Sequence, residues 1–293
     1  MSWLELKIDT SEHLAPTLGD VLSEFGALSI TFSDTQDDPV FEPALGETPL
    51  WRHTRVIGLF DATTDVQAIL AQLQQRFGAS AIGTTSLNPL ADEAWERTWM
   101  DHFAPTRFGR ALWICPSWCT PPEPDAVNIF MDPGLAFGTG THPTTALCLE
   151  WLDAHHPAQH VVVDYGCGSG ILAVAAAKLG AQRVIGVDHD PQALLATREN
   201  AQRNGVDTQI ETYLPEHMPP VSADLVLANI LANPLRELAA LFAGTVKPGG
   251  QIVLSGILTE QADDVRAAYE DAFMMCAPVT KQEWARLDGT RRG

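Results

Sequence analysis

The residues best suited to bind a ligand lie in a glycine-rich loop and in an acidic position further along the chain. In VVVDYGCGSG, an apolar run ends at Asp164 and is followed by Gly166, Gly168 and Gly170. Glycines let the backbone turn sharply and approach a ligand without interference from a Cβ atom. Asp188 follows the next apolar run, where its carboxylate can accept hydrogen bonds from both hydroxyls of a ribose. The pairing indicates a cofactor that contains a nucleoside.

The glycine pattern alone does not say which cofactor binds. The run from Gly168 to Ala173 also fits the G-x-G-x-x-A form of the dinucleotide fingerprint, and a tight strand-to-helix turn would need similar glycines. The negative charge of Asp164 would oppose a pyrophosphate, but it can accept hydrogen bonds from a cationic amino group. S-adenosylmethionine has such a group and no phosphate. S-adenosylmethionine is therefore favoured over NAD(P). Binding of NAD(P) would make the chain an oxidoreductase, but the sequence shows no plausible set of residues for hydride transfer.

The composition predicts a folded, acidic protein. The chain of 293 residues has 18 Lys and Arg against 37 Asp and Glu, a formal net charge of −19. This charge repels phosphate backbones, so no direct binding of nucleic acid is expected. Hydrophobic residues make up 45% and charged residues 19%, which is outside the range in which chains stay disordered.

The amino terminus and the cysteines indicate the cellular compartment. No window approaches the roughly 18 apolar residues of a membrane span, and MSWLELKIDTSEH has charges where a signal peptide needs its apolar stretch. The five cysteines are an odd number and form no CxxC pair, which argues against a disulfide framework or a zinc cage. We expect a cytoplasmic protein with no membrane partner, no metal and no cysteine nucleophile.

From about residue 105, apolar strands alternate with helices, which predicts a doubly wound α/β domain with parallel strands. Strands are expected at Val161–Tyr165 and Arg183–Val187, with an Ala-rich helix from about Ile171 to Leu179 and another after Pro191. Further strands are expected at Asp224–Ala228, Gln251–Ser255 and Phe273–Val279, and a turn at Lys247–Gly250.

The first ninety residues have a different pattern, β-α-β-β-α-β, which is typical of a ferredoxin-like α+β domain. Its strands are expected at Trp3–Ile8, Ala27–Phe32, Arg55–Phe60 and Ala81–Thr85, and its helices at Leu14–Phe25 and Asp65–Phe77. Trp95, Trp99 and Phe103 share one face of an amphipathic helix at Ala91–Phe103. We therefore divide the chain into a domain at 1–90, a connecting helix and linker at 91–104, and a second domain at 105–293.

The chain resembles a known family. The loop from Asp164 to Gly170, Asp188 and the KPGG turn resemble the class I methyltransferase fold, a Rossmann-like doubly wound sheet. MDPGLAFGTGTHPTT at 131–145 and NILANPL at 229–235 are similar to the bacterial PrmA family, methyltransferases of ribosomal protein eleven of the large subunit. The resemblance covers essentially the whole chain. It implies methyl transfer from S-adenosylmethionine to lysine side chains and the terminal α-amine of that basic protein.

The resemblance also implies site residues. Thr145, Gly166, Asp188 and Asn229 occupy positions that contact S-adenosylmethionine in that family, and Phe137 would cover its methionine end. Asn229 is followed by Ile230 and Leu231 rather than by the Pro-Pro-aromatic run of enzymes that methylate planar nitrogens, which fits an aliphatic amine. The expected cofactor-binding residues are Phe137, Thr145, Asp164, Gly166, Gly168, Gly170, Asp188, Asn229 and Ile230.

Asn229, with the backbone near Ile230, is the candidate for orienting the substrate amine. For His142, loop anchoring is favoured over proton transfer, although an imidazole could accept a proton near neutral pH.

Two alternatives to this interpretation stay open. The chain could be a ribosome-assembly module that has lost its cofactor, which the intact glycines and Asp188 disfavour. The first domain could recognise the substrate, as we expect, or merely stabilise the second domain.

Overall fold

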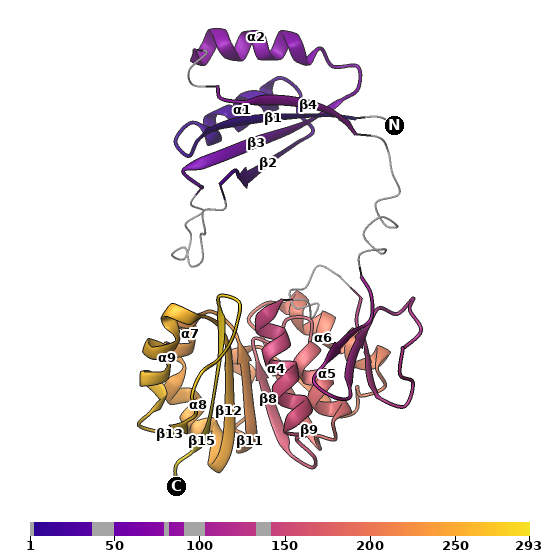
Figure 1. The fold of residues 1–293 in the computed structure, drawn as a ribbon, viewed down its shortest axis with the longest axis vertical. Coiled ribbons are helices and arrows are strands. Elements are labelled where there is room, and N and C mark those ends of the chain that lie inside the picture. The colour runs from indigo at the N-terminus through magenta and orange to yellow at the C-terminus, as the bar shows by residue number, and fades with distance from the viewer. Residues whose placement is uncertain (1–2, 37–49, 79–81, 91–102, 133–141) are drawn as a thin grey trace. The chain divides into compact units, whose positions relative to one another are not determined.

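A computed structural model describes residues 3–36, 50–78, 82–90, 103–132 and 142–293 (Figure 1). The chain divides into two compact units, Met1–Met100 and Asp101–Gly293. The helix expected at Ala91–Phe103 falls almost wholly outside the described residues, as does Phe137. No helix in the described part of the chain is long and apolar enough to cross a membrane.

The first unit has the predicted β-α-β-β-α-β order. Its elements are β1 (Trp3–Ser11), α1 (Ala15–Glu24), β2 (Ser29–Asp34), β3 (His53–Asp61), α2 (Val66–Phe77) and β4 (Thr85–Leu90). The four described strands form an antiparallel sheet in the order β2-β3-β1-β4. Alternate residues of β1 and β3, such as Leu6 and Val56, are buried with Leu18 and Leu22 of α1, and with Leu73 of α2. Strand periodicity thus gives this unit its own core.

The last strand of this unit was predicted wrongly at Ala81–Thr85, because β4 runs from Thr85 to Leu90 and includes Pro89. Pro89 lies opposite Leu4 of β1, at the edge of the described sheet. Proline lacks the N–H that a central strand must donate, but an edge strand tolerates it. The position of Pro89 in β4 is therefore compatible with the observed strand.

The second unit contains the doubly wound α/β fold that the sequence predicts. Its described strands form an eight-stranded sheet in the order β10-β9-β8-β11-β12-β15-β13, with β14 paired to β15. The strands are β8 (Val161–Tyr165), β9 (Arg183–Val187), β10 (Ile210–Tyr213), β11 (Ala223–Asn229), β12 (Val246–Leu258), β13 (Phe273–Met275), β14 (Val279–Lys281) and β15 (Trp284–Arg291). From β10 to β12 the neighbours are parallel, whereas β15 is antiparallel to its neighbours.

Helices cover both faces of this sheet (Figure 1). One face packs against α4 (Pro143–Ala154), α5 (Ile171–Lys178) and α6 (Pro191–Arg203), and the other against α7 (Ala232–Glu237), α8 (Ala239–Thr245) and α9 (Ala262–Tyr269). Short 3₁₀ helices lie at η2 (Pro215–His217) and η3 (Thr259–Gln261). Successive strand residues point to opposite faces, so Val162 lies in one core and Val163 in the other. Both faces are therefore apolar.

Several parts of this unit differ from the sequence prediction. A small sheet of β5 (Thr106–Phe108), β6 (Leu112–Cys115) and β7 (Val127–Phe130) was not predicted, and it shares the core of α4 and α5. The strand expected at Phe273–Val279 is instead split into β13 and β14, on either side of Pro278, which cannot donate to a strand ladder. The central antiparallel strand β15 was missed.

The Lys247–Gly250 segment is a bulge inside β12, and not a separate turn as predicted. Ala223 pairs with Val246 and Leu225 with Gln251, so the four residues between Val246 and Gln251 stand opposite Asp224 alone. Gly249 has φ of +78°, and a Cβ on Gly250 would lie 2.9 Å from the carbonyl oxygen of Asp224. Gly249 therefore provides the left-handed backbone conformation, and Gly250 allows the close approach of the two strands.

Candidate functional site

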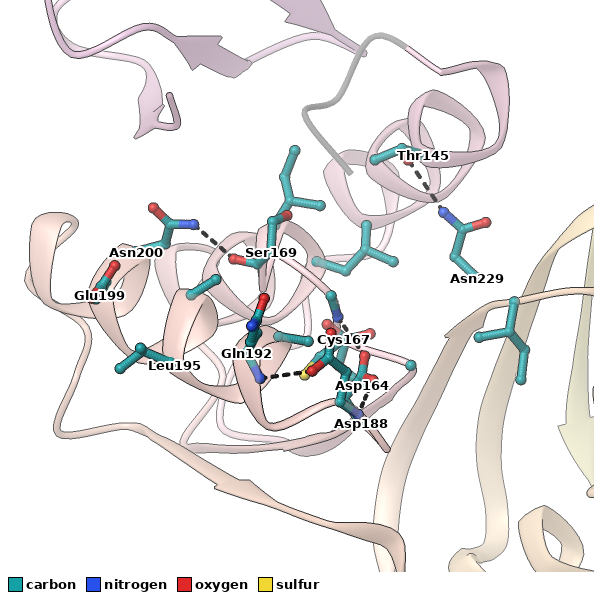
Figure 2. Close-up of a pocket in the computed structure, with 18 of the residues that line it drawn as sticks. Thr145, Asp164, Cys167, Ser169, Asp188, Gln192, Leu195, Glu199, Asn200 and Asn229 are labelled. Atoms are coloured by element: carbon teal, nitrogen blue, oxygen red, sulfur yellow. Dashed lines mark hydrogen bonds between the residues drawn. The ribbon is translucent and has the colours of Figure 1, made fainter. Parts of the chain in front are cut away.

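A cavity of about 860 Å³ opens where β8, β9 and β11 end, at the carboxyl edge of the sheet (Figure 2). Ligands bind at this edge in doubly wound sheets because the strand-to-helix loops meet there. The cavity is lined by the glycine loop after β8, by Asp188 and Asp190 after β9, and by one side of α6. Asn229 at the end of β11 and Ile230 directly after it complete this lining. Thr145 of α4 also lines it. The structure thus brings together residues from distant parts of the sequence.

Asp188 is held in a fixed orientation by two backbone donors. Its Oδ2 accepts a hydrogen bond from the Gly168 N–H at 2.9 Å, and its Oδ1 accepts one from the Asp190 N–H at 3.0 Å. The residue is 8% exposed and lines the cavity. Each carboxylate oxygen has a second lone pair, so Asp188 can still accept two hydrogen bonds from a ligand.

Asp164 is buried with one oxygen unpartnered. Its Oδ2 accepts a hydrogen bond from the Ala173 N–H at 3.0 Å, whereas its Oδ1 has no hydrogen-bond partner among the described residues. Burial, with a smaller contribution from the charge of Asp188, raises the pKa of Asp164 to about 7. A buried carboxylate oxygen is costly to leave unpaired. Since Asp164 lines the cavity, a cationic ligand group could satisfy it.

The three loop glycines all have positive φ, which favours glycine. Gly166 and Gly168 line the cavity, and a Cβ on Gly166 would overlap the Ile230 side chain. Gly170 was predicted to bind the cofactor, but it does not line the cavity. It is the N-cap residue of α5 instead, and a Cβ there would lie 2.8 Å from Thr197 Oγ1. Its place in the motif serves packing of α5 against α6.

Asn229 and Thr145, 84 positions apart, meet at one end of the cavity (Figure 2). The Asn229 Nδ2 donates to Thr145 Oγ1 at 3.2 Å, which fixes the amide orientation with its carbonyl oxygen as an acceptor. His142 caps α4, since its ring accepts from the Thr144 N–H at 3.4 Å, and burial lowers its pKa. His142 is thus placed to anchor the start of the helix that carries Thr145.

The sequence interpretation missed the side of the cavity formed by α6. Asp190 caps this helix, accepting a hydrogen bond from the Gln192 N–H at 2.9 Å. The missed lining residues include Gln192, Ala193, Ala196, Glu199 and Asn200. The sequence did contain a signal for this side of the cavity, because three of these residues recur at helical spacing after the cap: Ala193, Ala196 and Asn200. No group of three or more metal-ligand side chains lies together in the described ranges.

Fold and site together define a class I methyltransferase that uses S-adenosylmethionine. The family profile described as "Ribosomal protein L11 methyltransferase (PrmA)" matches residues 2–292. The chain therefore belongs to the ribosomal protein L11 methyltransferase family.

Relatives at full length support this membership. The chain is 55% identical over 293 residues to the ribosomal protein L11 methyltransferases of Serratia proteamaculans and Shewanella woodyi. Each match covers 100% of this chain and 100% of the relative. Among solved structures, the ribosomal protein L11 methylase of Lactobacillus delbrueckii subsp. bulgaricus is 33% identical, with a TM-score of 0.60. That match covers 65% of this chain and 100% of the other.

Proposed function

We propose that this protein transfers methyl groups from S-adenosylmethionine to amino groups of ribosomal protein L11. The observation that carries the proposal is the cavity, where two carboxylates lie side by side. The buried Asp164 has one oxygen without a partner among the described residues, and Asp188 is oriented by backbone donors. The full-length identity to relatives named for this substrate supports the choice of protein.

The proposed assignment of cofactor-binding residues follows from the donor and acceptor groups present. Asp188 accepts the ribose hydroxyls, and Asp164 accepts hydrogen bonds from the cationic amino group. Gly166 and Gly168 let the backbone come close, and Thr145, Asn229 and Ile230 form the opposite wall. When bound, the cofactor supplies a methyl group already activated by its sulfonium. The residues of the chain then need to bind the cofactor and the amine, orient the amine toward the methyl group and exclude water. No strong protein base is required.

The proposed substrate groups are lysine side chains and the amino-terminal α-amine. A lysine amine has an unperturbed pKa of about 10.4, so it must lose its proton before it can attack. The Asn229 carbonyl oxygen, oriented through Thr145, is the proposed acceptor that aligns the amine, together with the backbone near Ile230. The aliphatic Ile230 gives no flat aromatic surface on which a planar amide or base would stack.

The two units have different proposed roles. All cofactor-site residues lie in the second unit, whereas the first is a complete α+β fold with its own core. We assign the first unit to recognition of the ribosomal protein, and the 91–104 segment to the connection between the units. A ribosomal protein substrate supports a cytoplasmic location, and the acidic composition supports a basic protein partner rather than a nucleic acid.

Mass spectrometry of ribosomal protein L11 after incubation with the protein and S-adenosylmethionine tests the proposal. Mass increments of whole methyl groups on lysines and on the terminal amine are expected. Titration calorimetry with S-adenosylmethionine and with NADH is the accompanying control. Binding of NADH alone would indicate an oxidoreductase, and binding of neither would indicate an assembly module.

A further inference from the structure

The inner side of α6 binds two successive carbonyl groups of the glycine loop. Thr197 Oγ1 donates a hydrogen bond to the Gly168 carbonyl oxygen at 3.1 Å, and Asn200 Nδ2 donates one to the Ser169 carbonyl oxygen at 2.8 Å (Figure 2 shows the second). Thr197 is fully buried and Asn200 nearly so. The two donors stand three positions apart, which places them on one side of the helix.

The same loop segment is held from its other side by Asp188, which accepts the Gly168 N–H. Asp190 then joins Asp188 to α6, because its N–H donates to Asp188 and its carboxylate caps the helix. The loop, the ribose-binding carboxylate and α6 are therefore linked by hydrogen bonds into one unit. The described contacts hold Gly168 at both its amide and its carbonyl.

This loop needs such restraint more than most segments. Gly166, Gly168 and Gly170 all have positive φ, and glycine loses more conformational freedom on ordering than any other residue. Thr197 also packs tightly on Gly170, where a Cβ would meet its side chain and its Cα. If the loop is already ordered before the ligand binds, the entropy cost of ordering it does not reduce the binding free energy.

We infer that Thr197 and Asn200 are positioning residues that hold the glycine loop against Asp188 and so set the affinity for the cofactor. The inference rests on the proposed cofactor-binding role of this loop. Thr197 does not line the cavity, so its effect is exerted through the loop. Because neither side chain belongs to the Asn229 end of the cavity, the effect falls on cofactor binding rather than on the transfer step.

Titration calorimetry with S-adenosylmethionine tests Thr197→Val, which keeps the shape of the side chain and removes the donor. One hydrogen bond of this kind predicts a dissociation constant raised roughly three- to tenfold. Thr197→Ser retains the hydroxyl and is expected to restore most of the affinity. The rate of methyl transfer at saturating cofactor is expected to stay near that of the unchanged protein for both variants.

Thr245→Val is the matched control. Thr245 is buried on α8, on the other face of the sheet, and its Oγ1 donates to the Leu241 carbonyl oxygen at 2.8 Å. This variant loses the same kind of hydrogen bond far from the cofactor site, so its stability can fall while its affinity for the cofactor stays unchanged. Equal weakening of cofactor binding by Thr245→Val and Thr197→Val would overturn the inference, as would unchanged affinity in folded Thr197→Val.

A second variant and a cofactor-free readout keep the inference testable if Thr197→Val does not fold. Asn200→Asp keeps the oxygen that accepts from Arg203 Nη1 at 2.7 Å, but it loses the donor to Ser169. Amide hydrogen exchange in the loop is expected to be faster in this variant without cofactor, and unchanged exchange would refute the inference. Failure of the unchanged protein to bind S-adenosylmethionine would instead refute the proposed function.

Discussion

Ile230 packs directly over the α-carbon of Gly166, so closely that a Cβ on this glycine would overlap the isoleucine side chain. Gly256 is packed against the carbonyl group of Ile230 in the same way. Two glycines, from β12 and from the loop after β8, therefore fix the position of the residue that follows Asn229. Ile230 can occupy its place in the cavity wall because Gly166 and Gly256 have no side chains.

Gly166→Ala is expected to abolish measurable cofactor binding, because the added methyl group must displace Ile230 or the loop. Gly205→Ala is the control, since Gly205 also has positive φ but no atom lies within 4 Å of the position that a Cβ would take there. Both variants should lose about 1 to 2 kcal/mol of stability from the left-handed backbone. Calorimetry with S-adenosylmethionine should separate them, and equal affinities would contradict the role of Ile230 packing.

Asp188→Ala is expected to weaken cofactor binding at least tenfold. Hydrogen bonds to charged groups contribute roughly 1.5 to 3 kcal/mol each, and the variant leaves two ribose hydroxyls without an acceptor. Asp224→Ala is a matched control, because Asp224 accepts the Val161 N–H at 2.9 Å near the opposite edge of the sheet. Unchanged affinity in folded Asp188→Ala would remove Asp188 from the site.

Cofactor affinity is expected to rise with pH until it levels off above about pH 7. Burial raises the pKa of Asp164 to about 7, so in the cofactor-free protein its carboxyl is protonated at lower pH and cannot accept from a cation. Binding of the cationic group favours the ionised form and should release a proton. Calorimetry in buffers of different ionisation enthalpy measures this release, which Asp164→Asn should eliminate. Equal proton release by both proteins would contradict the assignment.

The stability of the cofactor-free protein gives an independent check on Asp164. Its folded pKa is raised, so its stabilising contribution is complete below the unfolded value of 3.8 and is lost as pH rises through about 7. Between these values the unchanged protein should lose stability relative to Asp164→Asn, by about 1.4 kcal/mol per pH unit at most. Urea unfolding of both proteins across this window provides the measurement.

Methylation of the ribosomal protein at low substrate concentration is expected to slow as salt rises. The net charge of −19 attracts a basic substrate, and salt screens charges beyond about 10 Å at 0.1 M. The second-order rate constant measured over a salt series is the test, with circular dichroism as the check on folding. A flat rate constant would show that electrostatic attraction does not speed the encounter.

A shortened protein spanning Asp101–Gly293 is expected to bind S-adenosylmethionine but to fail to methylate the ribosomal protein. The second unit has its own core and contains the whole described cavity, whereas the first unit is proposed to recognise the substrate. Calorimetry and mass spectrometry measure the two activities separately. Full methylation would refute the recognition role, and failure to fold would favour a stabilising role for the first unit.

The sequence by itself determined several local elements and the two groups of residues from which a nucleoside cofactor was predicted. The strands Val161–Tyr165 and Arg183–Val187 have the predicted bounds, because apolar runs of this length between glycines and polar turns leave few other conformations. The glycine loop and Asp188 were found because each directly follows a strand. Such signals depend on neighbours within a few positions of the chain.

Only the tertiary structure decided which distant groups meet. Strand pairing inserts β15 between β12 and β13, and helix packing forms the hydrogen bonds of α6 to the loop. The packed fold also buries the Asp164 oxygen that has no partner in the described part of the chain. Thr197 looks like an ordinary helix residue until the fold places it against Gly168, 29 positions back along the chain. Burial and hydrogen-bond partners are properties of the packed fold, and local residue patterns do not encode them individually.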